Sequence, residues 1–144
     1  MNKLPLLKSV MTPFPWWIDI DAPLQEAREM MRKHQVRHLP VKDRGSLVSV
    51  VTDRDLGQAL ESEHLRPSGE PLKVRDVCVD SVYVVDIDTR LEAMLETMTE
   101  RKIGSALVTR GDTLVGIFTA LDACRVLASL LHHLRGDDLE PRTA

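Results

Sequence analysis

The residues SVVTDRD at positions 49–55 decide the fold, because their pattern returns as GIFTALD at positions 116–122. In both stretches a small residue precedes an apolar run, which is typical of a buried strand. A threonine ends each run and an aspartate follows three residues later, which is the spacing of a helix capping box. Each stretch therefore predicts a strand that leads directly into a helix.

These two stretches are parts of a longer duplication. When the sequence is displaced by 67 positions, its two halves align without a gap, and identical residues coincide at Asp19/Asp86, Leu47/Leu114 and other pairs. Solenoid arrays have periods of about 20 to 50 residues and need three or more copies. We therefore expect two copies related by an internal pseudo-twofold axis.

Each copy predicts the order strand, helix, strand, strand, helix. In the first copy we expect a strand at 16–18, a helix at 22–35 capped by Asp21, strands at 38–41 and 47–51, and a helix after Thr52. In the second we expect a strand at 83–85, a helix at 89–101, strands at 105–108 and 114–118, and a helix at 120–134. A lone copy of about 60 residues would be only marginally stable. The prediction is thus an α+β fold in which two tandem β-α-β-β-α repeats pack together.

The predicted division of the chain follows from this layout. Residues 1–61 form the first repeat, and residues 62–72, which contain Pro67, Gly69 and Pro71, form a linker. Residues 73–134 form the second repeat, and the polar residues 135–144 are predicted to be a flexible tail.

Composition excludes several classes of protein. The 144 residues include 22 acidic and 19 basic side chains, giving a net charge of −3, so non-specific nucleic-acid binding is not expected. No apolar run approaches the roughly 18 residues of a membrane span, and the start of the chain lacks the apolar core of a signal peptide. Cys78 and Cys124 are far apart in the sequence, which favours reduced thiols. We expect a cytoplasmic protein without membrane or nucleic-acid partners.

The Thr/Asp pairs have two interpretations. In the first, Thr52 and Thr119 only cap their helices, which is the usual meaning of this spacing. In the second, the free amides and positive dipole of each helix N-terminus hold a phosphate, and the aspartate accepts both hydroxyls of a ribose. Ser49 or Gly116 at the head of the stretch would then let a ligand approach the backbone.

Two further segments complete a resemblance to a known family. VRHLPV at 36–41 and IGSALV at 103–108 open the middle strand of each copy. Together with the two Thr/Asp stretches, they make the chain resemble the CBS-domain pair, named after cystathionine beta-synthase, over residues 9–134. Leu107 stands where the family has proline, and Ser49 stands where it more often has glycine.

The resemblance implies a regulatory module, not an enzyme, that binds adenosine-containing ligands such as AMP, ADP or ATP, with or without Mg²⁺, and serves in energy sensing. It requires no other cofactor. In the family a site combines the Thr/Asp stretch of one repeat with segments of the other. Carried over, one site would contain Thr52, Arg54, Asp55, Val79, Ser81, Ile103, Gly104 and Ser105. The other would contain Thr119, Asp122, Thr12, Phe14, Val36, Arg37 and His38.

These two sites are predicted to be unequal. Arg54 offers a guanidinium group to a phosphate, whereas Leu121 stands at the equivalent place in the second copy. The alternative function is a ligand-free dimerisation or protein-interaction module. His34 and His38 could bind a metal only if both lay on one helix, and the helix is expected to end near Gln35.

A homodimer acting on an unidentified regulated protein is also predicted. Its apolar surface would come from the methionines at 30, 31, 94 and 98 and from one of the two adjacent tryptophans. Because neighbouring strand residues face opposite ways, we expect one of Trp16 and Trp17 in the core and the other exposed.

Overall fold

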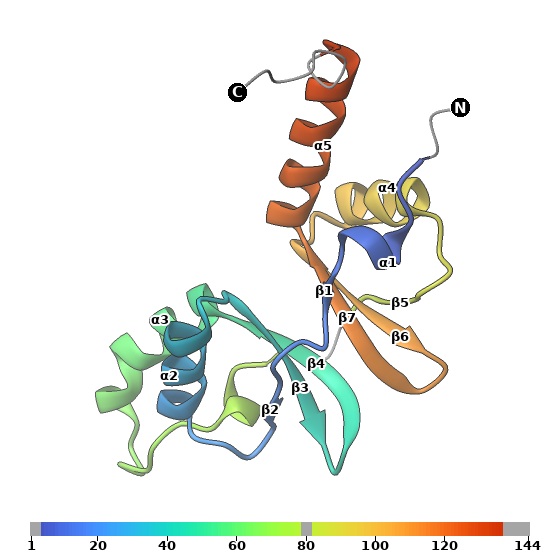
Figure 1. The fold of residues 1–144 in the computed structure, drawn as a ribbon. Helices are drawn as coiled ribbons and strands as arrows, with labels where there is room; N and C mark the ends of the chain where they lie inside the picture. Colours follow the sequence, from blue (N-terminus) through green and yellow to red (C-terminus); the bar gives the residue numbers. More distant parts are fainter. Residues whose placement is uncertain (1–3, 79–81, 137–144) are drawn as a thin grey trace. The chain divides into compact units, whose positions relative to one another are not determined.

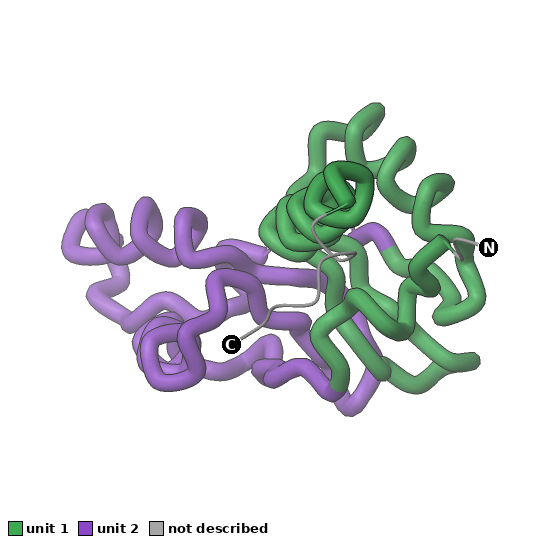
Figure 2. The backbone as a smooth tube through the Cα atoms, turned by 45° about the horizontal axis from the view of Figure 1, so that its top comes forward, with its two compact units in different colours: residues 1–13, 84–144 green, residues 14–83 purple. Residues whose placement is uncertain are grey.

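The computed structural model describes residues 4–78 and 82–136 of the chain. Two compact units are present (Figure 2). Unit 1 contains residues 1–13 and 84–144, and unit 2 contains residues 14–83. The predicted α+β architecture with two repeats of strand and helix elements is confirmed.

Unit 2 is built on a three-stranded sheet with the order β2 (Ile18–Asp19), β3 (His38–Asp43), β4 (Ser46–Thr52). Strand β2 is parallel to β3, and β3 is antiparallel to β4. Helices α2 (Leu24–His34) and α3 (Asp53–Ser62) belong to the same unit (Figure 1). The β3–β4 turn needs two residues with positive φ, which Arg44 and Gly45 supply at 51° and 81°.

The core of unit 2 follows from the two sequence periodicities. Helix α2 buries residues at spacings of three and four, and the strands bury Leu39, Val41 and Val51. Helix α2 ends as predicted at Gln35, whose left-handed conformation stops the helix. The buried residues of this core are Ile18, Ile20, Leu24, Ala27, Met31, Leu39, Val41, Val51, Leu56 and Val74.

Unit 1 repeats this plan with one additional strand. Its sheet has the order β1 (Thr12–Pro13), β7 (Thr113–Thr119), β6 (Ser105–Arg110), β5 (Val84–Asp86). Helices α1 (Leu7–Val10), α4 (Leu91–Arg101) and α5 (Ala120–Leu134) complete it. The pairing of Ser105 with Thr119 in unit 1 repeats that of His38 with Thr52 in unit 2, 67 residues earlier. Leu107, at the place of the family proline, is fully buried.

Each sequence repeat contributes its opening segment to the other repeat's unit. Helix α1 and strand β1 lie in unit 1, where β1 pairs with β7. The equivalent short helix η2 (Val74–Asp76) lies in unit 2, where the Val74 N–H donates to the Ala22 carbonyl at 2.9 Å. The Leu24 N–H, an amide without an intrahelical partner, donates to the Leu72 carbonyl. Besides η2, the segment between α3 and β5 contains the short helix η1 (Glu63–Leu65).

Three local predictions for the first repeat are wrong. Helix α2 begins at Leu24, after an extended Pro23 that caps nothing with its side chain. Asp21 instead forms an ion pair with Arg75 of η2, and hydrogen bonds from that guanidinium lower the pKa of the Asp21 carboxyl. The strand begins at Ile18, so the tryptophans precede it.

Both tryptophans are exposed, whereas one was expected in the core. Trp16 is 54% and Trp17 44% exposed. The Trp16 ring stacks on His34 at 3.7 Å, and the Lys42 ammonium lies 4.4 Å from the centre of the Trp17 ring. Each ring therefore contacts a polar side chain of a neighbouring element, and neither ring enters the apolar core.

In the second repeat the elements lie close to their predicted positions. Strand β5 is one residue later than predicted, helix α4 begins two residues later, and α5 has the predicted bounds. Met31, Met94 and Met98 are buried inside their units, so they do not supply the apolar surface that was expected for a dimer.

Two glycines provide a matched test of this packing. A Cβ at Gly116 of β7 would overlap the Sδ of Met11, so Gly116→Ala is expected to lower the free energy of unfolding by about 1–3 kcal/mol. Gly57 of α3 has open space around it, so Gly57→Ala should raise that free energy by up to about 1 kcal/mol through helix propensity. Urea denaturation measures both. Changes of the same sign would contradict this assignment.

Candidate functional site

Thr52 and Asp55 form the predicted capping box at the start of α3. The Thr52 hydroxyl accepts a hydrogen bond from the Asp55 N–H at 3.2 Å, and the Asp55 carboxylate accepts one from the Thr52 N–H at 3.4 Å. Asp55 is half-buried and has no ion pair within the described residues. Its carboxylate thus keeps capacity to accept further hydrogen bonds.

Thr119 and Asp122 form the equivalent box at the start of α5, but here the aspartate is more fully engaged. One Asp122 oxygen, Oδ2, accepts from the Thr119 N–H at 2.9 Å and from the Thr119 hydroxyl at 3.2 Å. The other, Oδ1, accepts from Arg125 at 3.2 Å. Asp122 is 4% exposed, and it is the buried residue of α5. The two boxes are therefore chemically unequal.

The segments that open the middle strands lie beside these boxes. In unit 2 the Asp53 N–H donates to the Arg37 carbonyl at 3.0 Å, and His38 pairs with Thr52. In unit 1 the Ala120 N–H donates in the same way to Gly104, and Ser105 pairs with Thr119. Each capping box thus lies next to the segment that begins the middle strand of its own repeat.

The structure distributes the predicted site residues over both units. Unit 2 brings together Val36, Arg37, His38, Thr52, Arg54 and Asp55, and unit 1 brings together Ile103, Gly104, Ser105, Thr119 and Asp122. Thr12 lies in β1 opposite Ile117, and Phe14 is 84% exposed with a φ of 45°. Val79 and Ser81 lie outside the described residues. The combinations across the two repeats that the resemblance implies stay predictions.

The small residues at the head of each stretch do not leave open space. Ser49 is 2% exposed. The Met11 side chain occupies the space beside Gly116 where a Cβ would lie. The Met11 thioether thus occupies the space beside Gly116, and the approach of a ligand to the backbone there stays a prediction.

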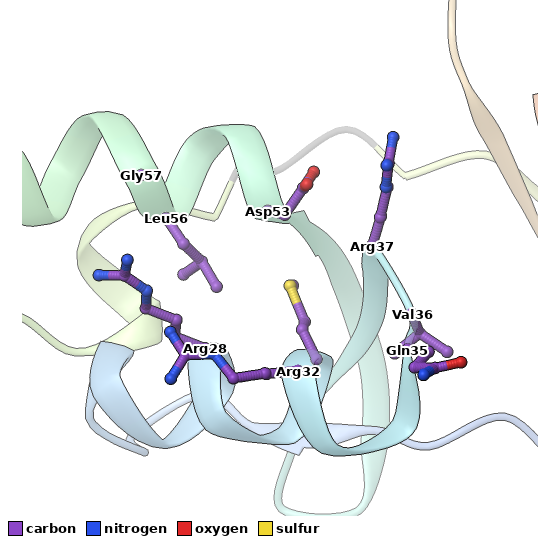
Figure 3. Close-up of a pocket in the computed structure, with 9 residues that line it drawn as sticks. Arg28, Arg32, Gln35, Val36, Arg37, Asp53, Leu56 and Gly57 are labelled. Atoms are coloured by element: carbon purple, nitrogen blue, oxygen red, sulfur yellow. The ribbon is translucent and has the colours of Figure 1, made fainter.

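Unit 2 also contains a cavity that the sequence interpretation missed (Figure 3). It has a volume of about 520 Å³. Its lining includes Val36 and Arg37, which are predicted site residues, as well as Asp53 and the α2 residues Arg28 and Arg32. A sequence signal for it was present. The two α2 arginines align with Leu95 and Thr99, so they interrupt the internal repeat.

Comparison with known proteins places the chain in a family. The family model of the CBS domain matches twice, at residues 7–62 and 74–129. This chain belongs to the CBS-domain family. CBS-domain pairs generally act as regulatory modules and not as enzymes.

Relatives of this CBS-domain pair span most of its length. Hypoxic response protein 1 of Mycobacterium tuberculosis is 31% identical over 105 residues, covering 72% of each chain. A putative acetoin utilization protein, AcuB, from Vibrio cholerae has a TM-score of 0.75 at 27% identity, covering 96% of this chain and 99% of its own. The structure of CBSX2 in complex with AMP has a TM-score of 0.69 at 26% identity, covering 87% and 97%.

One structural relative of this CBS-domain pair holds metal ions. A structure of hypoxic response protein I, 26% identical with a TM-score of 0.68 and covering 85% of this chain and 98% of its own, holds two coordinated zinc ions. Within residues 4–78 and 82–136, no cluster of three or more His, Cys, Asp or Glu side chains is arranged to hold a metal ion. His34 ends α2 and His38 begins β3, so they do not share a helix face.

No helix in the described ranges is long and apolar enough to cross a membrane.

Proposed function

We propose that this CBS-domain pair is a cytoplasmic regulatory module that binds an adenosine nucleotide of the AMP, ADP or ATP class, with or without Mg²⁺, at its Thr/Asp boxes. The observation that carries the proposal is the pair of Thr/Asp boxes, each at a helix N-terminus and each beside its own strand opening. A helix N-terminus attracts phosphate, and a carboxylate accepts both hydroxyls of a ribose. The resemblance to CBSX2, whose structure holds AMP, supports this ligand class.

The proposed site built on α3 is the stronger of the two. Arg54 is exposed in the first turn of α3 and can form two parallel hydrogen bonds to a phosphate, whereas Leu121 cannot. Asp55 retains accepting capacity, whereas both oxygens of Asp122 are already engaged within unit 1. Occupancy of the α3 site would shift the population of conformations that a regulated protein reads.

Thermal denaturation with adenosine, AMP, ADP, ATP and S-adenosylmethionine tests the proposal. A ligand that binds only the folded chain stabilises it by about 2.7 kcal/mol at a hundredfold excess over its Kd. We expect AMP, ADP or ATP to raise the Tm, and guanosine monophosphate serves as the control. A Tm that no adenosine compound changes would contradict the proposal.

The alternative is a ligand-free interaction module, and one observation favours it. Both threonines and both aspartates already satisfy each other as helix caps, so their presence does not require a ligand. In that case every compound of the panel leaves the Tm unchanged, and substitutions of the aspartates affect stability alone.

A homodimer is part of the proposal. Five leucines of α5 are between 40% and 76% exposed: Leu121, Leu127, Leu130, Leu131 and Leu134. Exposed apolar surface of this extent on one helix is typical of an interface. The leucines of α5 therefore replace the buried methionines as the apolar surface of the proposed dimer.

A further inference from the structure

The cavity of unit 2 lies between α2 and α3 and combines an apolar wall with positive charge (Figure 3). Met31 and Leu56 are buried apolar residues of its lining. Its charged lining residues are three arginines, at 28, 32 and 37, and one carboxylate, Asp53. Its volume of about 520 Å³ is within the usual range for small-molecule sites, which typically pair apolar walls with a few polar groups.

Folding does not require the pair Arg28 and Arg32, whose side chains are both exposed. The two lie four residues apart on α2, where like charges face each other and destabilise a helix. Within the described residues no carboxylate forms an ion pair with either of them. Arg32 lies in the last turn, where a cation favours the helix dipole, but Arg28 lies in the middle of the helix.

The second repeat provides an internal comparison. Met31 of the cavity aligns with Met98, which is also buried, so the apolar contact belongs to the repeated fold. Arg28 and Arg32 align instead with Leu95 and Thr99 of α4. The fold is therefore built without this arginine pair in one repeat, and the pair is specific to the cavity of unit 2.

The arrangement of the side chains suits an anion. Figure 3 shows the guanidinium groups of Arg28 and Arg32 at the same end of the cavity, near the part of α3 that carries Leu56 and Gly57. Asp53 lies away from them, between that end and Arg37. Arginine binds phosphate through two parallel hydrogen bonds, and the cavity has net positive charge in a chain whose net charge is −3.

We propose that this cavity binds a phosphorylated small molecule with an apolar body. Arg28 and Arg32 hold its phosphate group, and Met31 and Leu56 contact its body. All four residues belong to unit 2, and none is part of a Thr/Asp box. The lining also includes Val36 and Arg37, which the resemblance assigns to an adenosine site, but the phosphate is held here by residues outside that site. The inference therefore goes beyond the proposed adenosine site.

Isothermal titration calorimetry with phenyl phosphate tests the inference, because this probe has an aromatic body and a phosphate but no adenosine. We expect one molecule to bind per chain, more tightly than inorganic phosphate. The double variant Arg28→Leu/Arg32→Thr carries the residues of the second repeat and should bind at least tenfold more weakly. Lys33→Thr removes a charge from the same helix outside the cavity lining and should leave binding unchanged.

A second variant, Arg28→Gln/Arg32→Gln, keeps helix propensity and should show the same loss, which guards against poor folding of the first. Unchanged binding in a folded double variant, or an equal loss in Lys33→Thr, would overturn the inference. An AMP titration of the wild-type chain and of Arg28→Gln/Arg32→Gln separates the two proposals, because AMP also carries a phosphate on an apolar body. Failure of the adenosine site appears as AMP binding that is absent or that this variant loses, whereas failure of the cavity appears as phenyl phosphate binding that is absent or that the variant retains.

Discussion

The Asp55→Asn variant is expected to bind AMP at least tenfold more weakly than the wild-type chain, with little change in Tm. A charge-assisted hydrogen bond contributes about 1.5–3 kcal/mol, and asparagine cannot accept both ribose hydroxyls as a carboxylate does. Asparagine still offers an amide oxygen to the Thr52 N–H, whose present bond to Asp55 is long at 3.4 Å. Calorimetry measures the affinity, and thermal denaturation measures the stability.

The Asp122→Asn variant should show the opposite balance. Asp122 is buried, accepts two bonds from Thr119 and pairs with Arg125, so we expect a loss of about 1–3 kcal/mol of stability. Its effect on AMP affinity should be smaller than that of Asp55→Asn.

Asp112→Asn is the control for both aspartate variants. It removes an exposed carboxylate in the turn between β6 and β7, outside both capping boxes and the cavity lining, and it should change neither the AMP affinity nor the Tm by a comparable amount. If Asp55→Asn bound AMP normally and only melted earlier, the aspartates would be helix caps alone.

Local sequence patterns predicted the elements that are determined by short-range chemistry. The capping boxes at Thr52 and Thr119 lie where their spacing indicated, because capping needs only residues three apart. Helix α5 has its predicted bounds for the same reason, and Gln35 ends α2.

The failures concern residues whose partners are distant in sequence. Asp21 had the local features of a cap, but Arg75, which is 54 residues away, forms an ion pair with it. The sequence also did not predict that the first segment of each repeat belongs to the unit of the other repeat. A gapless internal alignment places Leu7 opposite Val74, but it does not indicate which unit either residue joins. The prediction for Trp16 and Trp17 assumed strand alternation, but both precede the strand, and their rings contact His34 and Lys42.

The cavity of unit 2 was missed for a related reason. The internal repeat drew attention to what the two halves share, namely the Thr/Asp boxes and the strand openings. Arg28 and Arg32 line a cavity but have no counterpart in the second half, so a search for shared residues passes over them. Departures from an internal repeat are therefore as informative about sites as its matches.

The Leu131→Glu variant is expected to be monomeric at concentrations where the wild-type chain is a dimer. Apolar or small residues of α5 recur at alternating spacings of four and three, at Ala120, Cys124, Leu127, Leu131 and Leu134, and all of them are exposed. This spacing is the seam of a helix that packs on another helix. Asp122, the buried residue of α5, lies on the opposite side of that heptad, so the seam faces away from the packed side of the helix.

A second copy of the chain fits this seam because an isologous dimer brings the same helix to the twofold axis. The dimer would then bury two Leu131 side chains, one from each copy, at up to about 1.5–3 kcal/mol per side chain, so a glutamate there should weaken association by roughly a hundredfold or more. Ser129→Glu adds the same charge to α5 outside the seam and should leave the dimer intact. Sedimentation velocity at micromolar concentration measures both variants. A dimer that persists in Leu131→Glu, or one that Ser129→Glu dissociates equally well, would exclude α5 as the interface.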